Sequence, residues 1–190
     1  MKKFILLPLL LLFYIPATAQ VSVLIVYHSE TGSTEQMASA VYEGASSVEG
    51  VEVVLLQSSE ATEDDLLKAE AIIVGSPVYN ANVTPEISRF IASWPFENEP
   101  LKDKIGAAFV TAGGISAGEE IVQMNILQSM LVFGMVVVGG AEWTQAFGAS
   151  AITGEEPFSD SSNNGIAPQF EEKGRALGVR VAQLALKFYK

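Results

Sequence analysis

The sequence predicts a single α/β domain in which a five-stranded, doubly wound parallel sheet lies between two layers of helices, as a three-layer sandwich. Five short runs rich in β-branched apolar residues recur along the chain, which is typical of strands buried on both faces of a sheet. Segments with helical spacing and polar faces separate these runs. Such alternation implies parallel strands joined by right-handed crossovers. The 190 residues fit one domain of this kind.

The expected elements alternate along almost the whole chain. Strands are expected at residues 21–27, 51–56, 71–74, 105–110 and 135–138. Helices are expected at residues 34–48, 63–69, 85–94, 119–132 and 170–188. Residues 139–167, rich in Gly, Ser, Asn and acidic side chains, are expected to form one long irregular loop. A loop of that length is usually functional or mobile, so it is either a solvated excursion or a segment that covers a ligand or contacts another subunit.

Residues 1–19 have the pattern of a cleavable export signal peptide. Two lysines precede an apolar run over residues 4–15, and the small-x-small ending Ala17-Thr18-Ala19 predicts cleavage after Ala19. The apolar run is shorter than the roughly 20 residues that a membrane-spanning helix needs, so a retained anchor is the weaker alternative. Residues 20–190 are therefore expected to form the mature domain, exported to the periplasm without stable membrane insertion.

Composition excludes several classes of chemistry. The chain has no cysteine and one histidine, His28, so disulfides, thiol nucleophiles, cysteine-ligated metals and histidine clusters are not expected. The 22 acidic side chains outnumber the 11 basic ones, giving a net charge of −11 that makes nucleic acid an unexpected partner. Loss of the signal with its two lysines leaves 9 basic against 22 acidic side chains, a charge of −13. A bound phosphate must therefore be held by a local arrangement.

The loop after the first expected strand has such an arrangement. It reads Ser29-Glu30-Thr31-Gly32-Ser33-Thr34 and leads directly into a helix. Its hydroxyl groups, its glycine and the free N–H groups of a helix start can hold a phosphate without Lys or Arg, provided that Glu30 points away. The alternative is an ordinary Ser/Thr helix cap. Neither G-x-x-x-x-G-K-[ST] nor G-x-G-x-x-G occurs here, which disfavours NTP hydrolysis and a Rossmann dinucleotide site.

Two further loops follow the third and fourth expected strands. One reads Pro77-Val78-Tyr79-Asn80-Ala81-Asn82, with an aromatic face and with amide groups suited to the edge of a heterocycle. The other runs from Thr111-Ala112-Gly113-Gly114 to Gly118, and its glycines permit a flat ligand to approach the backbone. Each loop alone could be an ordinary turn. Because ligands of doubly wound sheets bind at the carboxyl ends of the strands, the three loops together predict a phosphorylated planar cofactor.

These residues resemble the flavodoxin superfamily. Residues 25–38, IVYHSETGSTEQMA, are similar throughout to the FMN-phosphate signature of that superfamily. Residues 71–77, 133–138 and 146–154 are more similar to the WrbA-type NAD(P)H:quinone oxidoreductases than to electron-carrier flavodoxins. The resemblance covers nearly all of residues 21–188. It implies a flavodoxin-like fold, noncovalently bound FMN and a homodimer or homotetramer.

The resemblance also implies a role for each loop. Ser29 and residues 31–34 would bind the phosphate, residues 77–82 would lie along the isoalloxazine ring, and residues 111–118 would lie at its other edge. The chain departs from the WrbA-type enzymes at Tyr79-Asn80, where they carry an Arg-Phe pair, and at Phe133, where they carry a histidine beside the flavin. The basic side chain and the histidine that would flank a quinone or nicotinamide are thus missing.

Three hypotheses of function follow. The first is an FMN-dependent oxidoreductase that reduces quinones with NAD(P)H in two-electron steps, without a catalytic residue of the protein itself. That hypothesis is the leading one, but free NAD(P)H is not expected outside the cytoplasm. The export signal therefore keeps open a second hypothesis, an exported flavodoxin-like electron-transfer protein without nicotinamide activity. Its acidic surface would steer a basic redox-protein partner. The third is an interaction module that has lost FMN.

Overall fold

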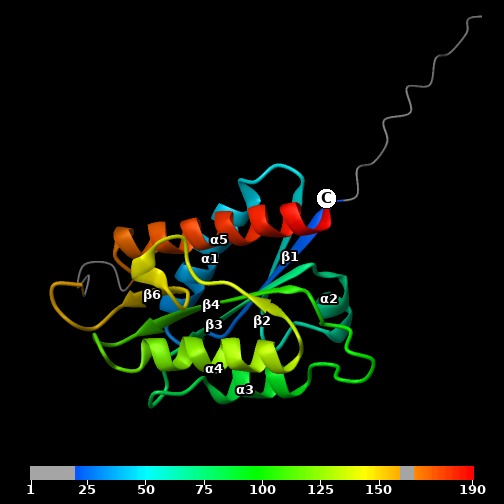
Figure 1. The fold of residues 1–190 in the computed structure, drawn as a ribbon. Helices are drawn as coiled ribbons and strands as arrows, with labels where there is room; N and C mark the ends of the chain where they lie inside the picture. Colours follow the sequence, from blue (N-terminus) through cyan, green and yellow to red (C-terminus); the bar gives the residue numbers. More distant parts are fainter. Residues whose placement is uncertain (1–19, 159–164) are drawn as a thin grey trace, which may run out of the picture.

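The computed structural model describes residues 20–158 and 165–190, so the predicted export signal, residues 1–19, lies outside the described residues. The chain forms a parallel sheet in the order β2-β1-β3-β4-β5, with β6 paired to β4 (Figure 1). The strands are β1 (Val21–Tyr27), β2 (Val51–Gln57), β3 (Ala71–Pro77), β4 (Ile105–Ala112), β5 (Val136–Val137) and β6 (Ala149–Ile152). The predicted doubly wound parallel sheet is therefore confirmed.

Helices cover both faces of this sheet. Figure 1 shows α1 (Ser33–Ser46) and α5 (Pro168–Tyr189) on one face and α3 (Pro85–Ala92) and α4 (Glu119–Val132) on the other. The short α2 (Glu63–Lys68) packs Leu66 into the core on the α3–α4 side. The predicted helices are thus confirmed to within a few residues at their ends. Within the described ranges, no helix has the combination of length and apolar character that crossing a bilayer requires.

The central strands are buried because they contribute side chains to two cores. Along β1, Val23 and Ile25 belong to the core under α1 and α5, whereas Leu24 and Val26 belong to the core under α3 and α4. Successive side chains of a strand point to opposite faces, so a strand covered on both sides needs an unbroken apolar sequence. This arrangement explains the continuous apolar runs seen in the sequence.

Helices α1 and α5 approach each other closely through glycines. A Cβ atom on Gly178 would lie 2.0 Å from the backbone oxygen of Val41, and one on Gly44 would lie 2.0 Å from that of Arg175. Real Cβ atoms do not come that near to backbone, so the spacing of these helices requires both glycines. The Arg175 Nε also donates to Glu43 Oε2 at 2.9 Å, which links the same two helices at their surface.

The far edge of the sheet differs from the prediction. The strand expected at residues 135–138 is reduced to β5, and residues 139–158, expected to be irregular, contain a short 3-10 turn (Trp143–Gln145) and β6. β5 pairs with the start of β4, and β6 pairs with its end at Phe109–Ala112. One edge position is therefore filled by two strands with an excursion between them. The rest of the expected loop includes residues 159–164, which lie outside the described residues.

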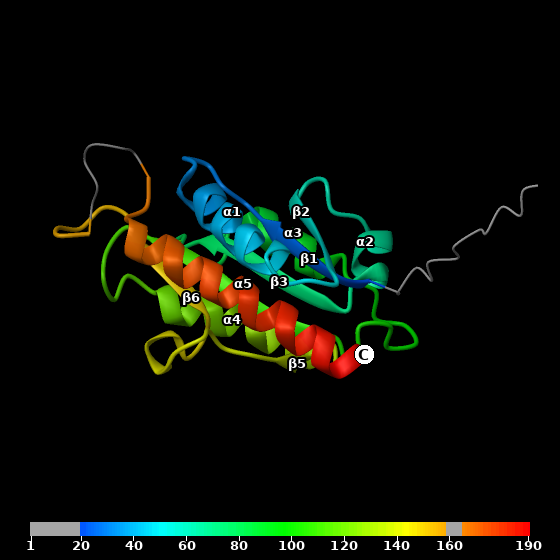
Figure 2. The same ribbon diagram turned by 90° about the horizontal axis from the view of Figure 1, so that it is seen from above.

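Both ends of the described chain lie at the amino ends of the strands. The Val21 N–H and the Lys190 Nζ both donate to the backbone oxygen of Gly50, at 3.2 and 3.4 Å. Figure 2 shows the C-terminus at the same end of the molecule as the start of β1. The loops predicted to bind a ligand follow the carboxyl ends of the strands, so they occupy the opposite end.

Candidate cofactor site

A cavity of about 190 Å³ opens at the carboxyl ends of β1, β3 and β4. The winding of the chain reverses between β1 and β3, which is where ligands of such sheets bind. The residues that line the cavity come from the loops after these strands and from the segment after β6, namely Glu30, Thr31, Ser33, Thr34, Pro77, Val78, Tyr79, Thr111, Ala112, Gly113 and Thr153. The three loops singled out in the sequence therefore meet at one site, and Thr153 is an addition.

The first loop leaves the start of α1 open to an anion. Gly32 precedes the helix with φ 96°, and no side chain caps the first turn. The ordinary Ser/Thr cap is thus not what the structure contains. The Ser29 Oγ instead accepts from the Gly32 N–H at 3.1 Å and shapes the loop, outside the cavity lining. An uncapped helix start, flanked by Thr31 and Ser33, favours negative charge through its N–H groups and its dipole.

A buried pair of hydroxyl groups joins the first loop to the third. Thr34 and Thr111, with exposed fractions of 2% and 4%, place their Oγ1 atoms 2.7 Å apart. The Val78 N–H donates to the backbone oxygen of Thr111 at 2.8 Å, which adds the second loop to the same framework. These hydrogen bonds fix the positions of the three loops relative to one another without a ligand.

The second loop is a tight hairpin that ends in an exposed aromatic ring. Tyr79 and Asn82 exchange backbone hydrogen bonds of 2.9 and 3.0 Å, and Asn80 and Ala81 have φ angles of 51° and 58°. Two successive positive φ angles are those of a two-residue type I′ turn. Tyr79 is 49% exposed at the cavity, whereas Asn80, Ala81 and Asn82 do not line it. Their assignment to the edge of a heterocycle stays a prediction.

The third loop is held by the segment that follows β6. The Ile115 N–H donates to Glu155 Oε2 at 2.6 Å, and the Gly154 N–H donates to the backbone oxygen of Gly113 at 3.0 Å. Gly118 precedes α4 with φ 109°, and a Cβ atom there would lie 2.8 Å from the Cβ of Ala81. Gly113 lines the cavity, whereas Gly114 and Gly118 shape the loop beside it.

The site is negatively charged. Among the residues that the structure describes, Glu30 is the single charged one in the cavity lining, and no Lys, Arg or His lines it. Glu35 follows in the first turn of α1, and its Oε1 accepts from the Tyr27 hydroxyl at 3.2 Å. Burial, followed by the nearby Glu35 carboxylate, raises the pKa of Tyr27 above its usual value. Among residues 20–158 and 165–190, no group of three His, Asp or Glu side chains is placed to hold a metal ion.

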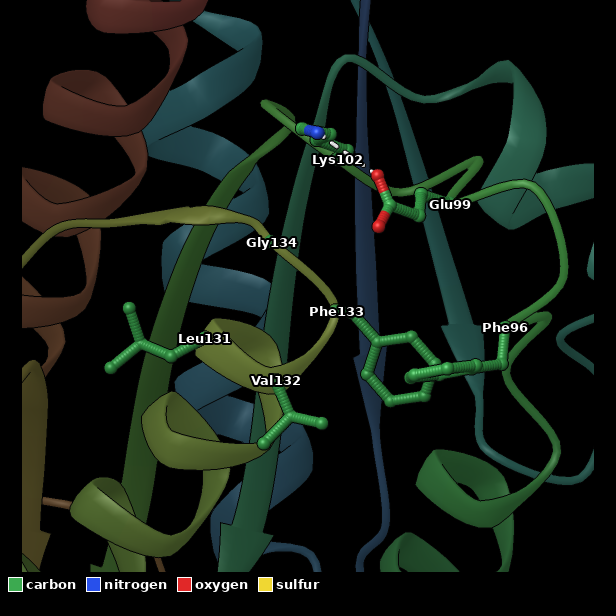
Figure 3. Close-up of a pocket in the computed structure, with 7 residues that line it drawn as sticks. All are labelled: Phe96, Glu99, Lys102, Leu131, Val132, Phe133 and Gly134. Atoms are coloured by element: carbon green, nitrogen blue, oxygen red, sulfur yellow. Dashed lines mark hydrogen bonds and ion pairs between the residues drawn. The ribbon is translucent and has the colours of Figure 1, made fainter.

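A second cavity, of about 200 Å³, lies at the other end of the molecule (Figure 3). Phe96, Leu131, Val132 and Phe133 line it beside the Glu99–Lys102 ion pair, whose atoms are 2.9 Å apart. Phe133 follows the end of α4, whereas the cofactor cavity lies at the start of that helix. Within one chain, Phe133 therefore lies away from the cofactor cavity, and its place beside a flavin stays a prediction.

The two tryptophans of the chain lie in different surroundings. Trp94 is 4% exposed and packs edge-to-face on Phe90 and Phe133, with ring centroids 5.7 and 5.2 Å apart. The Trp94 side chain therefore belongs to the packed core. Trp143 lies on the excursion between β5 and β6 and is 89% exposed. Neither ring lines the cofactor cavity, where Tyr79 is the aromatic side chain.

Several known proteins are similar to this chain. A family model for NADPH-dependent FMN reductases matches residues 57–149. A flavodoxin of Aquifex aeolicus is 35% identical over 171 residues, covering 85% of each chain. An NAD(P)H dehydrogenase (quinone) of Rhodopseudomonas palustris is 29% identical over 201 residues, covering 88% of this chain and 98% of that protein. The structure of a WrbA-like flavodoxin from Agrobacterium tumefaciens matches with a TM-score of 0.72 at 22% identity, covering 88% and 99% of the two chains.

The sheet order, with the three loops gathered at its switch point, defines a protein with a flavodoxin-like fold. A second flavodoxin, from Clostridium saccharobutylicum, is 33% identical over 158 residues and covers 83% of this chain and 93% of that protein. The chain belongs to the flavodoxin superfamily, whose cofactor is FMN, and its relatives include proteins of the WrbA type. The resemblance read from residues 25–38 is therefore confirmed.

Proposed function

We propose that this protein is an electron-transfer flavoprotein that binds FMN at the cavity beside β1, β3 and β4. The observation that carries the proposal is the cavity lining, in which hydroxyl groups and an uncapped helix start stand beside a half-exposed tyrosine, without a Lys, Arg or His. That set of groups fits a phosphate joined to a planar ring. It offers little to a second, polyanionic substrate.

The residues divide between the two parts of FMN. Thr31 and Ser33 would donate hydroxyl hydrogen bonds to the phosphate, together with the first N–H groups of α1. Pro77, Val78 and Tyr79 would form one wall for the ring, and Gly113 would let the ring approach the backbone on the other side. Bound FMN supplies reversible one- or two-electron transfer, and the protein supplies its orientation and electrostatic surroundings.

Charge favours a protein partner over a nicotinamide substrate. NADH and NADPH carry a pyrophosphate, which proteins usually hold with a helix start or with cations. The start of α1 is assigned to the FMN phosphate, and Glu30 at the cavity would repel a second anion. Acidic residues at this end would instead attract a basic redox partner and speed its encounter.

The second candidate is two-electron reduction of quinones by NAD(P)H. The match to NADPH-dependent FMN reductases and the similarity to the R. palustris quinone dehydrogenase favour it. In that case Tyr79 would flank the nicotinamide or the quinone stacked on the flavin, and the protein would act as a homodimer or homotetramer. For either candidate, we propose export to the periplasm after cleavage of residues 1–19.

Anaerobic reduction distinguishes the two candidates. Residues 20–190, loaded with FMN, are mixed with NADH or NADPH and then with a soluble quinone, and the flavin spectrum is followed. An electron carrier should ignore the nicotinamide and accumulate a one-electron reduced flavin with dithionite. Bleaching by NADPH and recovery with quinone would establish the reductase instead, and a colourless protein without FMN affinity would reject both.

A further inference from the structure

Glu30 is an unexpected residue in a phosphate-binding loop. It lines the cofactor cavity, and its side chain is 58% exposed. A carboxylate that could swing toward the bound phosphate would repel it, because like charges a few ångströms apart oppose each other even in water. The structure should therefore contain something that keeps the Glu30 carboxylate away from the start of α1.

The His28 imidazole lies beside the start of α3, which covers the face of the sheet opposite to α1 (Figure 1). Its backbone N–H donates to the oxygen of Gly75 at 3.2 Å, which fixes the residue at the end of β1. The imidazole is 18% exposed, and its Nε2 lies 3.9 Å from Glu30 Oε1 and 3.6 Å from Glu86 Oε2. This nitrogen is buried and makes no hydrogen bond within the part of the chain that the structure describes. A proton carried by this nitrogen would attract both carboxylates.

Glu86 is the fixed partner of the two. It lies in the first turn of α3, and its Oε1 accepts from the Arg89 guanidinium at 2.7 Å. A hydrogen bond from its own backbone N–H lowers the pKa of Glu86, and Arg89 and His28 add to this effect. Glu86 thus stays ionised and holds the imidazole from the α3 side. Glu30, on a more exposed loop, is the partner that can move.

We infer that His28 is a positioning residue for FMN binding: its imidazole, held by Glu86, draws the Glu30 carboxylate away from the phosphate at the start of α1. This inference rests on the proposed FMN site. The groups that face the imidazole are Glu30 from the loop and Glu86 from α3, with Arg89 behind Glu86. His28 makes no contact with FMN in this proposal and acts through Glu30 alone.

A double-mutant cycle tests the inference. Affinities for FMN and for riboflavin, which lacks the phosphate, are measured by flavin fluorescence quenching with residues 20–190. We expect His28→Ala to weaken FMN binding by about fourfold, the size of one like-charge repulsion at roughly 5 Å in water-like surroundings. Riboflavin binding should not change. Glu30→Gln should bind FMN at least as tightly as the wild type, and His28→Ala should have no effect in the Glu30→Gln background.

The outcomes separate this inference from the proposed function. If the wild type binds riboflavin and FMN equally, or neither, the phosphate site and the inference both fail. If the wild type prefers FMN but His28→Ala weakens FMN binding equally with and without Glu30, His28 has only a structural role and the inference alone fails. His28→Gln, which keeps a polar group near Glu30, should restore part of the affinity, and the melting temperatures of the apoproteins check that each variant folds.

Discussion

The buried hydroxyl pair Thr34–Thr111 gives a quantitative prediction about the framework of the site. Replacing Thr34 by Val keeps the shape of the side chain but leaves the Thr111 hydroxyl, 4% exposed, without its partner at 2.7 Å. A buried polar group without a hydrogen bond costs about 1–3 kcal/mol. Since a domain of this size loses roughly 2–4 °C in melting temperature per kcal/mol, Thr34→Val should melt several degrees lower. Thr111→Val should cost a similar amount.

The double variant is the decisive measurement. Removing both hydroxyl groups leaves no unsatisfied polar atom, so Thr34→Val combined with Thr111→Val should be nearly as stable as the wild type. Urea unfolding of apoprotein residues 20–190 gives the free energy of unfolding for all four proteins. If the two single losses simply add in the double variant, the pair does not act as a unit, and the argument that it joins the first and third loops is refuted.

Three further predictions concern separate features. Thr31→Ala, at an exposed position of the cavity, should weaken FMN binding by about tenfold or more and leave the melting temperature unchanged. The reason is that a hydrogen bond to a charged group contributes about 1.5–3 kcal/mol. Unchanged affinity in fluorescence titration would contradict the phosphate assignment. Gly178→Ala should destabilise the fold by about 2–3 kcal/mol in urea unfolding, because its Cβ would meet the backbone of Val41. Thr62→Ala removes the cap of α2 and should cost about 1 kcal/mol in the same assay. Hydrogen bonds from Thr62 lower the pKa of Asp65 in the folded protein. The stability that Asp65 adds should therefore be present above about pH 4 and be lost as the pH falls below it. Asp65→Asn should remove this part of the pH dependence of the free energy of unfolding.

The sequence predicts the strands well where burial on both sides demands apolar residues. β1, β3 and β4 were all expected from such runs, and every residue of β4 is buried. β6 escaped prediction because Ala-Ser-Ala-Ile has neither the length nor the β-branched composition of a typical strand. Its structure depends on pairing with Phe109–Ala112, a contact between distant segments that local sequence does not encode.

The same difference separates the site residues that could be predicted from those that could not. The first loop, residues 29–34, is continuous in sequence, so its hydroxyl groups and its glycine were visible together. Thr153 reaches the cavity because β6 places it beside Ala112, where its N–H donates to the backbone oxygen of Ala112 at 2.9 Å. Phe133 follows the end of α4, as the expected helix bounds already imply, and lines the second cavity.

The position of the two chain ends has a practical consequence. Val21 and Lys190 meet at Gly50, and the cofactor cavity is a full strand length away at the opposite end of the sheet. A linker attached at either terminus, whether to a membrane, a fusion partner or an electrode, would therefore leave the cavity pointing outward, toward molecules in solution. Immobilised in this way, the protein would offer the same face to every diffusing partner and keep its attachment point clear of the electron-transfer path.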